Sequence, residues 1–145
     1  MDGSGSITKE NFDLMKLFVS SLVERTVGSQ DKVAVVQFAG FPRAELSFNT
    51  HQTKPEIIGT ILNMKYLWGP TLLNLALWHA HLVELKEMKG DRPDVNNTIV
   101  IVTDGISGDI PDYIASLLRD QVMYCIKSID TVYSQWLYFT IEDEL

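Results

Sequence analysis

The chain of 145 residues contains only one cysteine, Cys125, so no internal disulfide can brace its fold. Long apolar runs are also missing, because stretches such as 33–36 and 99–102 fall far below the roughly 20 residues that cross a bilayer. Residues 1–4 have neither the basic start nor the apolar core of a secretory signal. These residues therefore predict neither a membrane span nor a signal peptide, and the cysteine count leaves the compartment open.

Positive charge is scarce as well. Twelve Lys and Arg stand against nineteen Asp and Glu, a net charge of -7, which would repel nucleic acid and anionic membrane from most of the surface. Hydrophobic residues make up 46% of the chain and charged residues 21%, as in globular proteins and unlike disordered or fibrous ones. The length fits one domain, so we expect residues 1–145 to form a single unit that contacts neither nucleic acid nor membrane.

Hydrophobic periodicity predicts alternating helices and strands. Apolar residues three and four apart draw a stripe along 11–27, with Thr8 as a candidate cap, and β-branched runs mark buried strands. The expected helices are 11–27, 55–64, 71–88 and 110–120, and the expected strands are 32–38, 44–48, 98–103 and 122–129. The tail, 130–145, is ambiguous and resembles the start of a last helix. This order predicts an α/β fold, doubly wound, with a mostly parallel sheet flanked by helices.

Two short segments at the predicted ends of the sheet are rich in side-chain oxygen. Residues 2–6 read Asp-Gly-Ser-Gly-Ser before a helix, and 103–107 read Thr-Asp-Gly-Ile-Ser after the most apolar strand. Ligands of open parallel sheets bind at the carboxyl ends of strands, and hydroxyls with carboxylates suit a hard cation such as Mg²⁺ or Mn²⁺. A third hydroxyl, that of Thr71, precedes another helix.

These three segments, in this order, resemble the metal-ion-dependent adhesion site of von Willebrand factor A domains, and most of all the inserted domain of integrin α subunits. The resemblance covers most of the chain. It implies a Mg²⁺ or Mn²⁺ ion held by five residues: Asp2, Ser4, Ser6, Thr71 and Asp104. It also implies a binding module rather than an enzyme, located outside the cell or on its surface. Its ion would coordinate a carboxylate of a matrix or cell-surface protein in cell adhesion.

The start of the chain departs from that family. Family members place an apolar strand in the centre of the sheet directly before the first Asp, whereas only Met1 precedes Asp2 here. We therefore expect a domain that is partial at its N-terminus, and possibly at its C-terminus, with the first central strand missing. The neighbours of that strand would keep unpaired backbone groups, which predicts reduced stability.

Other interpretations remain open. Residues 2–11 match part of an EF-hand calcium loop, with Asp2 at loop position three and Gly5 at six, but Asn11 stands where a bidentate Glu belongs. A Mg²⁺-dependent phosphate hydrolase would use Asp104 as nucleophile or ligand, although neither acidic loop carries the Lys or Arg that a phosphoryl group needs. A nonfunctional truncated isoform is the third alternative.

Three tryptophans and one glycosylation pattern lie outside these motifs. Trp68, Trp78 and Trp136 are expected in or near the core, with Trp68 close enough to Thr71 to line a binding face. Residues 96–98 match the glycosylation pattern at Asn96.

Overall fold

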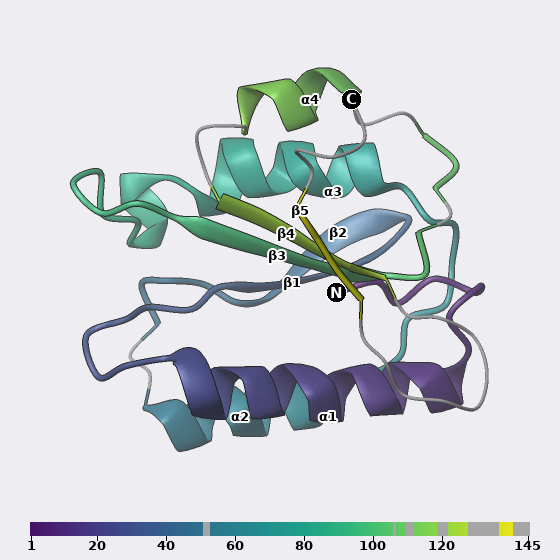
Figure 1. Cartoon of the computed structure of the whole chain (residues 1–145), viewed down its shortest axis with the longest axis horizontal. Helices are drawn as coiled ribbons and strands as arrows, with labels where there is room; N and C mark the ends of the chain where they lie inside the picture. Colours follow the sequence, from purple (N-terminus) through teal and green to yellow (C-terminus); the bar gives the residue numbers. More distant parts are fainter. Residues whose placement is uncertain (51–52, 106, 110–111, 119–121, 128–136, 141–145) are drawn as a thin grey trace.

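The computed structural model describes residues 1–50, 53–105, 107–109, 112–118, 122–127 and 137–140. Helices and strands alternate along the chain as predicted, and the helices lie on both sides of the strands (Figure 1). The elements are α1 (Lys9–Thr26), β1 (Val35–Ala39), β2 (Phe41–Leu46), α2 (Lys54–Leu62), α3 (Leu73–His79), β3 (Thr98–Thr103), α4 (Asp112–Leu117), β4 (Val122–Lys127) and β5 (Leu137–Thr140). The doubly wound α/β fold is confirmed.

The strands form two groups joined by the first residues of the chain. β1 pairs with β2 antiparallel, while β3 pairs with β4 in parallel and β4 with β5 antiparallel. Asp2 forms a parallel bridge with Phe38, and its amide donates to Val102 O at 2.8 Å. Residues 1–3 therefore lie between β1 and β3. Parallel pairing occupies the middle of the assembly, and antiparallel strands form both edges.

Met1 is buried at this junction. Its α-amino nitrogen donates to Val36 O at 2.8 Å, and Phe38 N donates to Met1 O at 3.0 Å. Burial lowers the pKa of this amino group to about 6, against the opposing effect of the Asp2 charge. These two bonds attach Met1 to β1.

Two apolar clusters pack on opposite faces of the strands. The cluster under α1 and α2 includes Phe12, Met15 and Ile61, each fully buried, together with Val102 from β3. The cluster under α3 and α4 includes Leu77 and Ile101. The predicted stripe on α1 faces the first cluster, and Thr8 caps this helix as expected, accepting from Asn11 N at 3.4 Å. No helix within the described ranges is long and apolar enough to cross a membrane.

The predicted helix 71–88 is interrupted. α3 ends at His79 and continues as a π-helical turn, Ala80–Glu84, and a short 3-10 turn, Glu87–Lys89. The wider π turn accompanies the burial of the Glu84 carboxylate, which accepts from Ser47 Oγ at 2.8 Å. The Leu- and Ala-rich sequence of 71–88 does not show where the α-helix changes to a π turn. Gly90 ends the 3-10 turn with a left-handed backbone, φ +93°.

The tail corrects another expectation. Leu137–Thr140 form strand β5 rather than part of a helix, in keeping with the strand preference of the Leu-Tyr-Phe-Thr sequence. Trp136, like the rest of 128–136, lies outside the described residues, and so does the side chain of Cys125. Asn96 is exposed in the loop before β3.

Candidate metal site

Asp2 is the most firmly held of the predicted ligands. Its side chain is fully buried, and both carboxylate oxygens accept hydrogen bonds: Oδ1 from Ser4 N at 2.9 Å and Oδ2 from Thr103 Oγ1 at 2.7 Å. A Cβ at residue 3 would meet the Nε2 end of the buried Gln37 side chain, so a larger residue there would force Gln37 to shift. The first loop is therefore fixed between β1 and β3.

The two serine hydroxyls lie side by side. Ser4 Oγ and Ser6 Oγ are 3.0 Å apart, with Ser4 buried and Ser6 exposed, so the pair extends from the interior to the surface. Octahedral Mg²⁺ holds oxygen ligands at about 2.1 Å, which sets neighbouring ligands about 3 Å apart. The spacing of the two hydroxyls therefore fits adjacent positions on such an ion.

Hydrogen bonds link the three predicted loops pairwise. Gly5 N donates to Gly69 O at 2.8 Å, which ties the first loop to the second. Gly108 N donates to Thr71 O at 2.8 Å, which ties the second loop to the third, and the bond between Thr103 and Asp2 ties the third to the first. Thr71 and Asp104 are both half-buried in these loops. The structure thus brings their backbone segments to Ser4 and Ser6, while metal ligation by their side chains stays a prediction.

Hydroxyls are the side-chain groups that gather at Ser4 and Ser6, and Tyr66 adds another. Among the described residues, no group of three or more His, Cys, Asp and Glu side chains could hold a metal. A site here would therefore depend on the hydroxyls. The Tyr66 hydroxyl donates to the backbone oxygen of Ser4 at 2.9 Å and so helps to hold the first loop. Burial, with the charges of Asp2 and Glu10, raises the pKa of Tyr66 and keeps it a donor.

Sequence reasoning assigned no role to several residues that build the site. Thr103 is buried, and its hydroxyl donates to the Asp2 carboxylate. The only sign of this role in the sequence is a hydroxyl residue at the end of an apolar strand. Gly69 lies so close to β1 that a Cβ would approach Ala39 O to 2.8 Å. Asp109 accepts from Asn74 N and Leu75 N at the start of α3, although sequence separates them by more than thirty positions.

Trp68 was expected in or near the core, but the structure places it at the surface. It is 72% exposed and has a left-handed backbone, φ +54°, a conformation that costs energy in a bulky residue. Its amide donates to Gly3 O at 3.0 Å, and its indole lies over Gly5. Trp68 therefore lies against the first loop, beside Ser4 and Ser6. This position is compatible with the expectation that Trp68 lines a binding face near Thr71.

Comparisons with known proteins bear on the family. The von Willebrand factor type A domain matches residues 1–137. Mouse collagen alpha-1(XX) chain is 35% identical over 123 residues, covering 83% of this chain and 9% of its own length, and human matrilin-1 is 32% identical over 123 residues, covering 83% and 25%. The chain thus spans a small part of these relatives.

A solved structure agrees with the fold. Proximal thread matrix protein 1 from the mussel byssus, with a zinc-occupied MIDAS motif, has a TM-score of 0.79 and 30% identity, covering 88% of this chain and 36% of that one. The narrower resemblance to the inserted domain of integrin α subunits stays a prediction from the sequence. From the match over residues 1–137 and the shared fold, the chain belongs to the von Willebrand factor type A domain family.

Proposed function

We propose that this chain is a binding module that holds Mg²⁺ or Mn²⁺ and uses the ion to take up a carboxylate of a protein partner. The observation that carries the proposal is the meeting of three loops around the Ser4 and Ser6 hydroxyls, 3.0 Å apart beside the buried Asp2. The proposed ligands are Asp2, Ser4, Ser6, Thr71 and Asp104. The zinc-occupied motif of the mussel protein supports a divalent cation at this edge.

The chemistry follows from the ligand types. Both oxygens of Asp2 already accept hydrogen bonds, so Asp2 acts best through its neighbours or through water, and the neutral hydroxyls supply the direct contacts. A cation bound mainly by neutral oxygens keeps most of its charge and attracts one more anionic oxygen. A Glu or Asp of a partner would supply that oxygen, and truncating it would cost about 2–5 kcal/mol of binding.

Exposed apolar side chains lie on the segments next to the candidate site. Trp68 is 72% exposed and Phe41 is 85% exposed. Gly40 N, next to Phe41, donates to Pro70 O, two residues after Trp68, at 2.6 Å. Aromatic anchors around a central polar contact are typical of binding hot spots. Together with the collagen and matrilin relatives, they support a protein ligand outside the cell, in adhesion or matrix contact.

The first test is cation binding by the purified chain. Titration with Mn²⁺, followed by electron paramagnetic resonance, should give one saturable site. Asp104→Ala and Thr71→Ala should weaken it strongly, while Asp94→Ala and Thr98→Ala, at exposed positions, should leave it unchanged. Binding that survives Asp104→Ala and prefers Ca²⁺ over Mg²⁺ would instead support the calcium-loop alternative.

The second test addresses the partner and the absence of catalysis. A surface that carries glutamate-containing peptides should retain the chain in Mg²⁺ and release it in excess chelator, whereas glutamine versions should not retain it. Retention that persists in chelator contradicts the carboxylate mechanism. Turnover of a generic phosphoester in Mg²⁺ would favour the hydrolase alternative, and the lack of any cation binding would favour a nonfunctional isoform.

A further inference from the structure

The sequence contains a single Asn-x-Ser/Thr triplet in its 145 residues, Asn96-Asn97-Thr98. Its middle residue is not proline, so the triplet meets the sequence condition for attachment of an oligosaccharide to the asparagine. Because such triplets also occur inside folds, where a bulky sugar has no room, the surroundings of the triplet decide its meaning. It lies in the loop that leads into β3, and the candidate metal site does not include it.

A tight turn brings the chain to the surface just before the triplet. Val95 N donates to Arg92 O at 3.0 Å, and Pro93 occupies the second position of this turn, where its fixed φ is favoured. The Arg92 guanidinium holds the base of the turn by donating to Gln30 O at 3.1 Å. Residues 93–96 are all exposed. The turn therefore directs the acceptor asparagine toward solvent.

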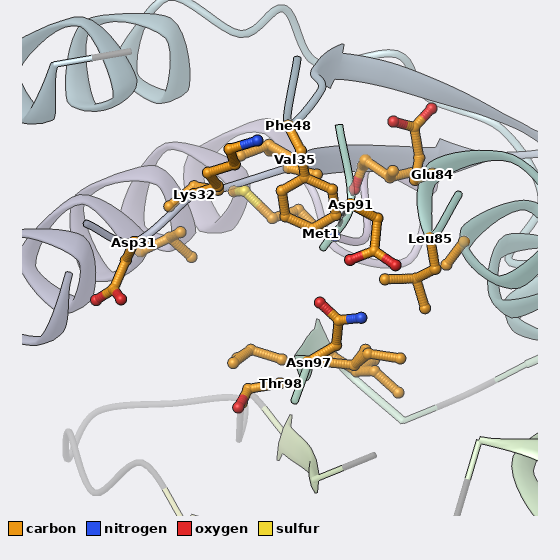
Figure 2. A pocket seen from close by; sticks show the side chains of 18 of the residues that line it. Met1, Asp31, Lys32, Val35, Phe48, Glu84, Leu85, Asp91, Asn97 and Thr98 are labelled. Carbon is orange, nitrogen blue, oxygen red and sulfur yellow. Dashed lines mark hydrogen bonds between the residues drawn. The ribbon is translucent and has the colours of Figure 1, made fainter. Parts of the chain in front are cut away.

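The two residues that define the pattern lie on the same side of the chain. Successive side chains of an extended segment point to opposite sides, so Asn96 and Thr98 share one side and Asn97 takes the other. Burial agrees with this arrangement, because Asn96 and Thr98 are exposed and Asn97 is half-buried. In the close view of the pocket beside β3, Asn97 points toward Met1 and Asp91, whereas Thr98 points away from them (Figure 2). Both residues that a transferase must reach therefore face solvent.

The Asn96 side chain has no hydrogen bond to any other residue that the structure describes. Other asparagines are used by the fold: Asn49 Nδ2 donates to Met88 O at 3.4 Å, and Asn63 Nδ2 donates to Gly59 O at 2.8 Å. A sugar attached to the amide nitrogen of Asn96 would therefore displace no bond within the described chain.

The triplet and the candidate metal site lie at opposite ends of one strand. β3 begins at Thr98 and ends at Thr103, whose hydroxyl donates to Asp2. Five steps of about 3.3 Å place these two ends about 16 Å apart. A glycan at the amino end of β3 would therefore lie at the other edge of the sheet from Ser4 and Ser6, where a protein partner at the ion would not meet it.

From these features we propose that Asn96 is the attachment point of an N-linked oligosaccharide, added when the chain passes through the secretory pathway. The inference rests on one part of the proposed function, the location outside the cell, and does not need the cation. In the transfer, Asn96 Nδ2 forms a bond to C1 of the first N-acetylglucosamine of a lipid-pyrophosphate-linked oligosaccharide. The bond between C1 and the pyrophosphate oxygen breaks, the amide nitrogen gives up one proton, and the lipid pyrophosphate leaves.

The test expresses the full chain behind a cleavable secretory signal in mammalian cells and examines cell protein and medium together. The wild-type chain should give a larger species that peptide-N-glycosidase returns to the unmodified size, with Asn96 converted to Asp in the mass spectrum. Asn96→Gln and Thr98→Val should both lose this species. The matched changes Asn97→Gln and Thr98→Ser, which keep the triplet, should retain it. A wild-type chain without the larger species overturns the proposal, as does its persistence in Asn96→Gln.

A second measurement tests whether the folded domain accommodates the sugar. The glycosylated chain and Asn96→Gln should have the same circular dichroism spectrum and should bind Mn²⁺ with affinities within about twofold of each other. A glycosylated chain that is unfolded, beside a folded Asn96→Gln, overturns the proposal because it contradicts the exposed position of Asn96. If both proteins are folded and neither binds Mn²⁺, the result contradicts the proposed metal site and supports the assignment of Asn96, so the two failures are distinguishable.

Discussion

At the scale of single residues, the buried carboxylate of Asp2 is the group on which the candidate site depends. A buried charge is tolerated only when its oxygens are hydrogen-bonded, and Asp2 meets this need with one backbone donor and one hydroxyl. Thr103 supplies the hydroxyl, and Gly105 N in turn donates to Thr103 Oγ1 at 3.2 Å. The threonine therefore connects the orientation of Asp2 to the turn that carries Asp104.

Thr103→Val should destabilise the fold by about 1–3 kcal/mol, because the methyl group keeps the shape and removes the donor to a buried carboxylate. Urea unfolding in chelator measures this loss. Thr98→Val, at the exposed first position of the same strand, should change the free energy of unfolding by less than about 0.5 kcal/mol. Equal effects of the two changes would show that the bond to Asp2 contributes nothing.

Asp109 gives a prediction on pH. Burial opposes ionisation of this carboxyl, but hydrogen bonds from Ser107 and from the amides of Asn74, Leu75 and Asp109 itself outweigh it and lower the pKa below its ordinary value of 3.8. The stabilising effect is therefore complete above that value and is lost as the pH falls through the lowered pKa. Asp109→Asn should cost about 1–2 kcal/mol at neutral pH, since α3 has no cap of its own.

The denaturant midpoints of the wild-type chain and Asp109→Asn, followed from pH 7 downward, check this expectation. The two midpoints should converge in acid. A constant difference at every pH would mean that the asparagine disturbs packing rather than removing an ionised cap. Asp94→Asn, in an exposed loop, serves as the control for the change in charge.

At the scale of elements, the segment between α2 and α3 is held by close backbone contacts. Gly69 O accepts from Gly5 N, and Pro70 O accepts from Gly40 N, so this segment touches both the first loop and the turn between β1 and β2. The position of Thr71 therefore depends on the absence of a side chain at residue 69.

Gly69→Ala should weaken Mn²⁺ binding and lower stability, because the new methyl group would meet Ala39 O at 2.8 Å and push the Thr71 segment outward. Gly59→Ala is the matched control. Gly59 lies inside α2 with no neighbouring atom within 4 Å of an added Cβ, so the change should stabilise the helix by about 0.5–1 kcal/mol. Thermal unfolding should show a lower Tm for Gly69→Ala and a higher Tm for Gly59→Ala. Mn²⁺ titration should show weaker binding only for Gly69→Ala.

Most elements were predictable because their signals are local. The stripe of Phe12, Met15 and Val23 predicts α1, and the apolar run before Asp104 predicts β3 with its observed bounds. The end of α3 at His79 was not predictable, since the π turn that follows it carries Glu84 into a contact with Ser47, which lies far away in the sequence. For the same reason the motif pointed to Asp2, Ser4 and Ser6 but not to the supporting Thr103.

For the molecule as a whole, a bound cation should stabilise the fold, because its proposed ligands come from three loops spread over residues 2 to 104. A ligand at about 100 times its dissociation constant adds about 2.7 kcal/mol, which raises the Tm of a domain of this size by roughly 5–10 °C. Scanning calorimetry with Mg²⁺ and with chelator measures the shift. The same shift in Asp104→Ala would place the bound ion elsewhere.

The bond between Thr103 Oγ1 and Asp2 Oδ2 joins residues 101 positions apart. Contacts between residues so far apart in the sequence slow folding, and during synthesis Asp2 emerges from the ribosome well before its partner. For most of that time Asp2, Ser4 and Ser6 lack the strand that orients them. A nascent chain would consequently acquire its ion only after β3 has docked, so uptake of the metal would report that folding is nearly finished rather than help to start it.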